Sequence, residues 1–148
     1  MSGIQALLLP VEGDLYALPM DWAREVVAAP PLTRLVTAPP IVLGLFNLRG
    51  QIVPLLDTAD LLGMGTAATT TFAVVVNYPQ GPVGLAASGL PQRAVLDSPT
   101  GPSELPGTAG LYRLGERVTA LLDPAALLAP ERLGRAESHG DPAAIGAR

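Results

Sequence analysis

An arginine followed by a glycine stands between two apolar runs, at Arg49 and Gly50 in the segment FNLRGQIVPLL. Glycine permits backbone conformations that other residues resist, so the pair predicts a tight turn between two strands. Arginine offers five N–H donors in a fixed plane, which suits bidentate pairing with a carboxylate. The residues alone leave two interpretations open: an exposed arginine on a structural turn, or a contact point for a partner.

Two further polar side chains are candidates to hold the arginine and its turn. The first is Glu25. Asp21 is the predicted N-cap of a short helix that runs to Val27, and Glu25 would lie near the end of this helix. A Glu25–Arg49 ion pair at the edge of an apolar surface would fix both side chains; otherwise Glu25 is a solvated helix residue. Asn47 precedes the turn, where its amide can satisfy backbone groups, and we expect that role to be structural.

Groups that usually carry catalysis or bind metals are scarce in this chain. There is no cysteine, and the single histidine, His139, lies in a polar tail, so no nucleophile–base pair can be assembled. Asp57 and Asp60 have the i, i+3 spacing of a metal or acid–base pair. We favour Asp57 as a helix N-cap, because Asp123 repeats its position without a second acid. We therefore expect no enzyme, no cofactor and no metal.

The arginine and its turn belong to one copy of an internal repeat. Residues 44–62, GLFNLRGQIVPLLDTADLL, return 66 positions later as residues 110–128, GLYRLGERVTALLDPAALL, with nine of 19 positions identical. Upstream, residues 4–18 align in pattern with residues 71–85 at an offset of 67. The shared residues are interpreted as scaffold.

The polar residues of the first copy are not kept in the second. Asn47, Arg49 and Gly50 are replaced by Arg113, Gly115 and Glu116. Because the second copy makes its turn without the arginine, this difference is where function should be sought.

Each half predicts the same order of elements: a hairpin, a connecting segment, two more strands and a short capped helix. Val74–Val76 are three consecutive β-branched residues and indicate a strand buried on both faces. The loop 97–107 and the polar tail are expected to be mobile. Short strands with Gly and Pro punctuation predict an all-β fold of two small barrels, which share an aliphatic core because about 65 residues form a marginal domain alone.

Composition limits the possible partners. The 148 residues are 49% hydrophobic but only 4% aromatic, with a net charge of −4. All nine basic residues are arginine. With acidic residues in excess, the sequence does not predict the positively charged surface that binds nucleic acid or an anionic membrane. No apolar run reaches the length of about 18 residues that is needed to span a bilayer. The first residues of the sequence do not have the pattern of a signal peptide. We expect a cytoplasmic protein.

The segment 39–62, PPIVLGLFNLRGQIVPLLDTADLL, resembles the signature of the CheW-like family, with the proline pair, Asn-Leu-Arg-Gly and Pro-Leu-Leu-Asp in order. YALPMDWAREVV and PPLTRLVTAPP upstream, and VGLAASGLPQRAVL and GLYRLGERVTALLDPAALL downstream, resemble its other blocks. The resemblance covers about residues 4–129.

The resemblance implies two five-stranded SH3/OB-like barrels, related by duplication, with strand exchange. We expect the first mainly in residues 4–65, the second mainly in 70–129, and a flexible tail over 130–148. It also implies an adaptor that couples chemoreceptor tips to the regulatory domain of a CheA-type histidine kinase. The partner-binding residues that we predict on this basis are Glu25, Gly44, Asn47, Leu48, Arg49 and Gly50.

Some residues depart from the family pattern. The resemblance also implies a receptor-binding groove near the junction of the two halves. Ala87 and Ser88 stand where many members have Val-Asp, so the sequence leaves open whether this groove binds a receptor here. The alternatives are a small-ligand-binding double barrel with its pocket between the halves, and an adaptor of a pilus-motility or other non-flagellar system. The pathway, the receptors and the oligomeric state are left open by the sequence.

Overall fold

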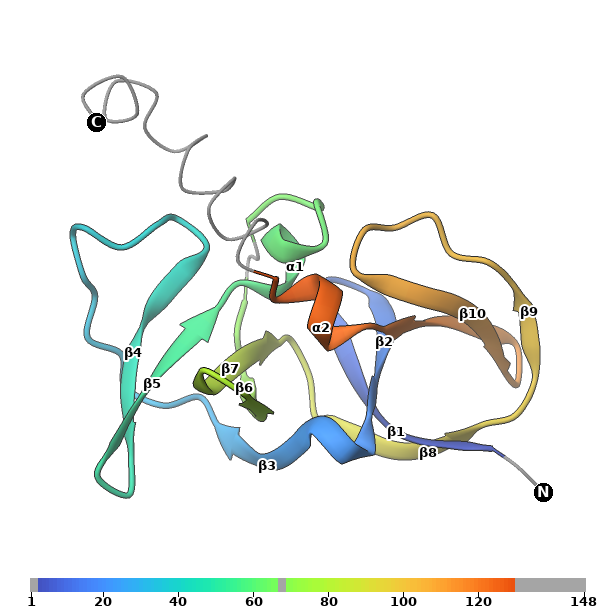
Figure 1. Cartoon of the computed structure of the whole chain (residues 1–148), viewed down its shortest axis with the longest axis horizontal. Helices are drawn as coiled ribbons and strands as arrows, with labels where there is room; N and C mark the ends of the chain where they lie inside the picture. Colours follow the sequence, from blue (N-terminus) through green and yellow to red (C-terminus); the bar gives the residue numbers. More distant parts are fainter. Residues whose placement is uncertain (1–2, 67–68, 130–148) are drawn as a thin grey trace.

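The computed structural model describes residues 3–66 and 69–129, which form strands and three short helical segments (Figure 1). The strands are β1 (Ile4–Val11), β2 (Asp14–Pro19), β3 (Ala23–Ala28), β4 (Val42–Leu48), β5 (Gln51–Leu56), β6 (Phe72–Tyr78), β7 (Gly81–Ala87), β8 (Gln92–Leu96), β9 (Pro99–Gly101), β10 (Thr108–Leu114) and β11 (Arg117–Leu122). The helices are the 3-10 segment η1 (Met20–Trp22), α1 (Thr58–Leu61) and α2 (Pro124–Leu127).

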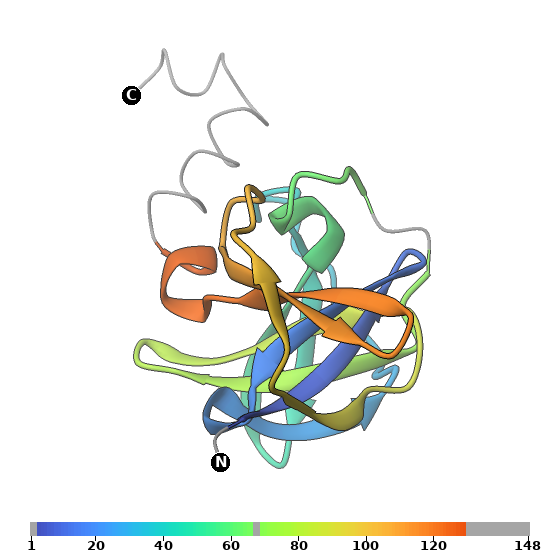
Figure 2. The same ribbon diagram turned by 90° about the vertical axis from the view of Figure 1, so that its right-hand side faces the viewer.

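The strands form two barrel-like sheets that exchange hairpins. One sheet has the order β8-β1-β2-β11-β10-β9, and the other has the order β3-β6-β7-β5-β4. The β1–β2 hairpin thus joins strands of the second half, while the β6–β7 hairpin joins strands of the first. Figure 2 turns the first of these sheets toward the viewer, with β10 and β11 in orange and β1 and β2 in blue.

The two sheets repeat one another, apart from the short edge strand β9. Each contains one parallel contact, between β11 and β2 or between β5 and β7. The registers agree as well: Leu121 lies opposite Ala17, and Leu55 lies opposite Gly84, as the repeat offsets require. The predicted duplication with strand exchange is confirmed.

The predicted helix from Asp21 to Val27 is wrong. The 3-10 segment η1 ends at Trp22, and residues 23–28 form strand β3, antiparallel to the valine-rich β6. Exposed and partly buried residues alternate along β3, which is the two-residue period of a strand. Pairing with β6 therefore makes residues 23–28 a strand despite their helical propensity, and Glu25 lies on that strand.

The expected loop over 97–107 contains strand β9, which pairs with β10 and makes that sheet six-stranded instead of five-stranded. The predicted tail, residues 130–148 with His139, lies outside the described residues.

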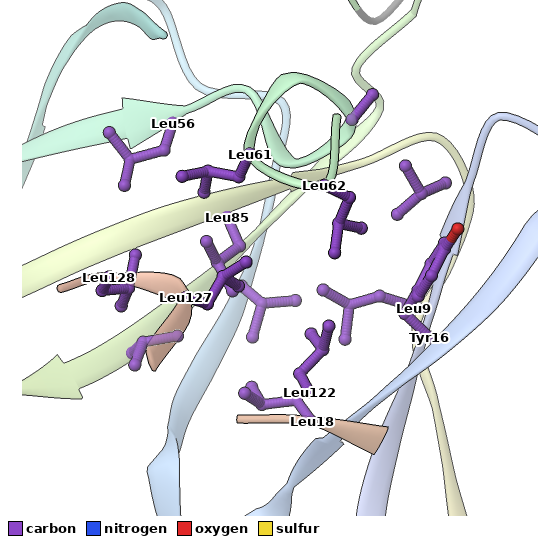
Figure 3. Packing of buried hydrophobic residues seen from close by; sticks show 14 of the residues in the cluster. Leu9, Tyr16, Leu18, Leu56, Leu61, Leu62, Leu85, Leu122, Leu127 and Leu128 are labelled. Atoms are coloured by element: carbon purple, nitrogen blue, oxygen red, sulfur yellow. The ribbon is translucent and has the colours of Figure 1, made fainter. Parts of the chain in front are cut away.

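A leucine-rich core lies between the two sheets (Figure 3). Its fully buried side chains come from both sheets and both α-helices: Leu9, Leu18, Leu61, Leu62, Leu85, Leu122, Leu127 and Leu128. Each fully buried leucine stabilises the fold by about 1.5–3 kcal/mol. The predicted aliphatic core shared by the halves is confirmed. Val74–Val76 are also fully buried, as their β-branched run predicts.

Candidate partner-binding site

The site is built on the two-residue turn between β4 and β5. Leu48 and Gln51 pair at the end of the hairpin, and the turn residues Arg49 and Gly50 have φ angles of 51° and 88°. Positive φ at both positions is the type I′ pattern, which matches the twist of the flanking strands. The Asn47 side-chain oxygen accepts a hydrogen bond from the Gly50 N–H at 2.8 Å, which confirms its predicted structural role.

The structure brings Glu25 and Arg49 together. Arg49 Nη2 donates to both carboxylate oxygens of Glu25 at 2.7 Å. Glu25 comes from β3 and Arg49 from the β4–β5 turn, so the pair joins the two edges of one sheet. A second contact runs beside it, from Arg24 Nη1 to Gln51 Oε1 at 3.3 Å.

The Glu25–Arg49 pair uses only part of the guanidinium. Both of its hydrogen bonds start at Nη2, and among the described residues the Nε and Nη1 groups of Arg49 have no partner. The Arg49 side chain is 64% exposed and that of Glu25 is 27% exposed. Arg49 is thus held in place by Glu25 while its other N–H donors face solvent.

The backbone at Arg49 gives no reason for an arginine. Left-handed backbone costs a residue with a side chain about 1–2 kcal/mol, and type I′ turns favour Asn, Asp or Gly at this position. An exposed ion pair returns only about 0–1 kcal/mol. Local stability alone would select another residue here.

An exposed apolar side chain lies next to the turn. Ile52 is directly opposite Asn47 in the β4–β5 register, and its side chain is 57% exposed. Val26, the residue after Glu25 on β3, is exposed as well, but consecutive residues of a strand face opposite sides of the sheet, so it lies on the other face from Glu25. An orienting charge near an exposed aliphatic residue is a composition found at protein interfaces.

Gly44 and Leu48, also predicted as partner-binding residues, lie below the surface. A Cβ at position 44 would lie 2.9 Å from the Leu32 Cβ and 3.1 Å from the Thr33 oxygen, so only glycine admits the chain that packs over it. Leu48 belongs to the core of the β3-to-β7 sheet, with Phe46. Their part in partner binding stays a prediction, and it would act through the shape of the hairpin.

The aspartates act as predicted helix caps. Asp57 is buried and accepts a hydrogen bond from the Asp60 N–H at 3.2 Å, while Asp123 accepts from the Ala126 N–H at 3.4 Å. Burial, and then the charge of Asp57, raise the pKa of Asp60 above its ordinary value. In residues 3–66 and 69–129 no three His, Asp or Glu side chains gather as a metal site.

Ser88, at one of the departures from the family pattern, connects the two sheets. Its hydroxyl donates to the Pro10 carbonyl at 3.1 Å and accepts from the Glu12 N–H at 3.2 Å. The residue therefore ties the end of β7 to the β1–β2 hairpin. Nothing in the one sequence signalled this contact, because its partner lies 78 positions away.

Sequence reasoning also missed the apolar tip of the loop between β3 and β4. Leu35 and Val36 are exposed there. The available signal was an aliphatic pair set between two proline pairs, which must form a surface connection.

The part of the chain that the structure describes contains no helix long and apolar enough to cross a membrane.

Comparisons with known proteins agree with this fold. The solved structure of the scaffolding protein TtCheW from Thermoanaerobacter tengcongensis superposes with a TM-score of 0.72 at 19% identity, over 82% of this chain and 85% of that one. The chemotaxis protein CheW of Klebsiella aerogenes is 26% identical over 141 residues, 88% of this chain and 85% of that protein. The chemotaxis protein CheW of Rhizobium meliloti is 40% identical over 75 residues, 51% of this chain and 48% of that protein.

The family assignment rests on the sequence as a whole. The model of the CheW-like domain matches residues 5–132, a range that contains both sheets except Ile4 at the start of β1, together with the Glu25–Arg49 pair. With nearly the full length matched and the exchanged hairpins in place, the chain belongs to the CheW-like domain family.

Proposed function

We propose that this chain, a CheW-like adaptor of chemotaxis signalling, couples the cytoplasmic tip of a chemoreceptor to the regulatory domain of a CheA-type histidine kinase. It acts by binding and needs no cofactor or reaction of its own. The proposal places it in the cytoplasm, beside these partners. Which chemosensory pathway it serves, flagellar or pilus-based, follows from the kinase that it binds.

The site assignment rests on the guanidinium of Arg49, which donates hydrogen bonds to Glu25 from Nη2 alone. Glu25 holds one nitrogen, the backbone is kept in a left-handed conformation, and the remaining donors face solvent. The second half folds into the same hairpin without this residue. Arg49 is thus positioned at a cost to the turn, which supports a role outside the fold.

In the proposed complex, Arg49 gives orientation and the apolar neighbours give affinity. An interface of standard size buries about 1,600 Å² in total, and a few residues near its centre usually dominate the binding energy. Arginine is enriched among such residues. Ile52, exposed beside the turn, would be covered by the partner.

The first test is the substitution Arg49→Ala in the full chain. We expect the affinity for the kinase regulatory domain or the receptor tip to fall by about tenfold or more, which is ~1.4 kcal/mol. Calorimetric titration measures the affinity, and circular dichroism checks the fold. Arg113→Ala is the matched control, since it removes an exposed arginine from the equivalent hairpin of the second half. Equal, unchanged affinity in both folded variants would refute the site.

A charge exchange separates two roles of the arginine. The double variant Glu25→Arg with Arg49→Glu keeps an ion pair across the sheet edges but reverses its direction. If the partner contacts the guanidinium, binding stays weak although the pair is restored. Recovery of wild-type affinity would mean that Arg49 only secures β3 to the hairpin.

The alternative of a small-ligand-binding double barrel is not favoured. The junction between the sheets, where such a pocket was expected, is filled by the leucine core shown in Figure 3. The relatives are a scaffolding protein and chemotaxis proteins.

A further inference from the structure

Met64 carries an exposed thioether at the rim of the leucine core. It lies in the connection that follows α1, and it is 36% exposed. Its Sδ accepts a hydrogen bond from the Tyr16 hydroxyl, with an O–S distance of 3.1 Å. Met20, by contrast, is only partly exposed and packs against the leucine core. Of these two methionines, Met64 is therefore the more accessible to a reagent in solution.

The backbone fixes the position of Met64. The Gly63 N–H donates to the Asp60 oxygen at 3.0 Å, and the Met64 N–H donates to the Ala59 oxygen at 2.8 Å. These two bonds form the Schellman motif that ends α1, and Gly63 supplies its left-handed residue, with a φ angle of 79°. A hydrophobic residue is common at the position of Met64 in this motif. The motif thus accounts for an apolar side chain there, but it does not require sulfur.

The donor to this sulfur is a buried hydroxyl. Tyr16 lies on β2 and is 5% exposed, and in Figure 3 its oxygen, drawn in red, lies at the edge of the leucine cluster. Within residues 3–66 and 69–129, the Met64 sulfur is the only hydrogen-bond partner of this hydroxyl. Burial, and then the charge of Asp14, raise the pKa of Tyr16 above its ordinary value of 10.0. The hydroxyl therefore keeps its proton at neutral pH and acts as a donor.

The contact between Tyr16 and Met64 joins the two halves. β2 lies in the sheet that contains β10 and β11, while α1 follows β5 of the other sheet. The repeat has no second copy of this contact, because Val83 and Pro130 occupy the aligned positions. The duplicated fold therefore does not require a hydroxyl–sulfur contact.

An accessible thioether reacts with hydroperoxides. A sulfur lone pair attacks the terminal oxygen of the hydroperoxide, so that an S–O bond forms while the O–O bond breaks. The proton of the transferred oxygen passes to the leaving oxygen, which becomes water or an alcohol. The sulfur is oxidised by loss of an electron pair, and the hydroperoxide is reduced. The product, methionine sulfoxide, is returned to methionine by reductases that each accept one sulfoxide epimer.

The Tyr16 hydroxyl determines which epimer forms. It covers one lone pair of the Met64 sulfur, so a hydroperoxide reaches the other. The new oxygen then points away from Tyr16. The sulfur of a sulfoxide carries a partial positive charge, so it no longer attracts the hydroxyl hydrogen. A buried hydroxyl that has lost its acceptor destabilises the folded state.

We propose that Met64 is a site of reversible oxidation by hydroperoxides, and that its sulfoxide releases the contact with Tyr16 that joins the two halves. Oxidation then loosens the connection after α1 from β2. The inference goes beyond the adaptor function and does not depend on which partner Arg49 binds.

The test treats the full chain with hydrogen peroxide and follows the oxidation of each methionine by peptide mass spectrometry. We expect Met64 to be oxidised about tenfold faster than Met20, because susceptibility follows exposure. The oxidised chain should melt at a lower temperature. A reductase specific for one epimer should restore the melting temperature, and a reductase specific for the other should not.

Two methionine substitutions locate the effect. Met64→Leu keeps an apolar side chain that cannot be oxidised, so peroxide should leave its melting temperature unchanged. Met20→Leu is the matched control and should keep the full shift of the wild type. Oxidation of Met20 before Met64, or a full shift in Met64→Leu, would refute the site.

Tyr16→Phe tests the release of the contact. This variant keeps the ring but lacks the hydroxyl, so oxidation of Met64 should lower its melting temperature much less and should give both epimers. An equal shift in Tyr16→Phe and the wild type would overturn the release. A higher melting temperature of the oxidised wild type would mean that the sulfoxide oxygen accepts the hydrogen bond from Tyr16, and the proposed release would be wrong.

Discussion

The β4–β5 and β10–β11 hairpins are two versions of one structure, and they differ at the turn. Both carry a bulge at the same place, after Val42 in one and after Thr108 in the other. Both expose an aliphatic residue at the same aligned position, Ile52 or Val118.

The turns reach the same pairing by different backbones. In the first hairpin both turn residues have positive φ, while in the second only Gly115 does, at 60°. This is the order of a type II′ turn, with glycine first. Since either turn closes the hairpin, the fold does not require an arginine at this position.

A second difference lies in the helix caps that follow. Asp57 is almost completely buried, at 1% exposure, while Asp123 is partly exposed. Asp57 also has a second acid three residues on, where the second half has Ala126. The same capping residue is thus buried in one half and partly exposed in the other. The same substitution at both sites can therefore measure how burial changes the strength of the cap.

The largest expected difference is between Asp57→Ala and Asp123→Ala. An N-cap substitution of this kind costs about 0.5–2 kcal/mol. We expect about 2 kcal/mol for Asp57, because water cannot replace the lost acceptor in a buried position, and about 1 kcal/mol for Asp123. Denaturant unfolding measures both. Asp57→Asn, which keeps an acceptor, should restore most of the loss. Equal costs at the two sites would show that burial does not set the strength of the cap.

A smaller difference in stability should distinguish the cost of the backbone conformation at Arg49 from the role of its side chain in binding. Arg49→Asn and Arg49→Ala both remove the Glu25 ion pair, but asparagine tolerates left-handed backbone and alanine does not. We expect the asparagine variant to be more stable by about 0.5–1 kcal/mol, although both bind the partner equally weakly. Gly115→Asn and Gly115→Ala should show the same order without a change in binding. Binding that followed stability would assign the role of Arg49 to the turn.

The repeat made much of this comparison predictable from sequence. Nine identities in 19 positions located the two hairpins, and Asp57 and Asp123 marked both caps. The Arg-Gly pair indicated the turn, and the contact with Glu25 followed as a hypothesis, although Glu25 was expected on a helix. These features depend on neighbours in the chain, so local patterns suffice to find them.

What the sequence did not supply are contacts between distant segments. Residues 23–28 form a strand because β6 lies beside them, and no local pattern contains that partner. β9 forms because β10 offers a free edge to a segment rich in proline and glycine. The exposure of Val36 was equally hidden, since a valine in a sequence does not show whether another element covers it.

The smallest expected effect concerns Asp60, the acid that Ala126 replaces in the second half. Burial and the charge of Asp57 raise the pKa of Asp60 above 3.8, so the folded state binds its proton more tightly than the unfolded state does. Stability therefore falls as pH rises from 3.8 through the raised pKa, and the penalty is fully present above it.

Asp60→Asn removes this penalty and should raise the melting temperature slightly at pH 7. The gain should disappear below pH 3.8, where the wild-type carboxyl is neutral in both states. Thermal unfolding at both pH values measures this, and Glu104→Gln, which neutralises an exposed acid, is the control. A lower melting temperature for Asp60→Asn at pH 7 would mean that attraction to the positive start of α1 outweighs burial. In that case the second acid, which the other half lacks, would strengthen the cap of the first half.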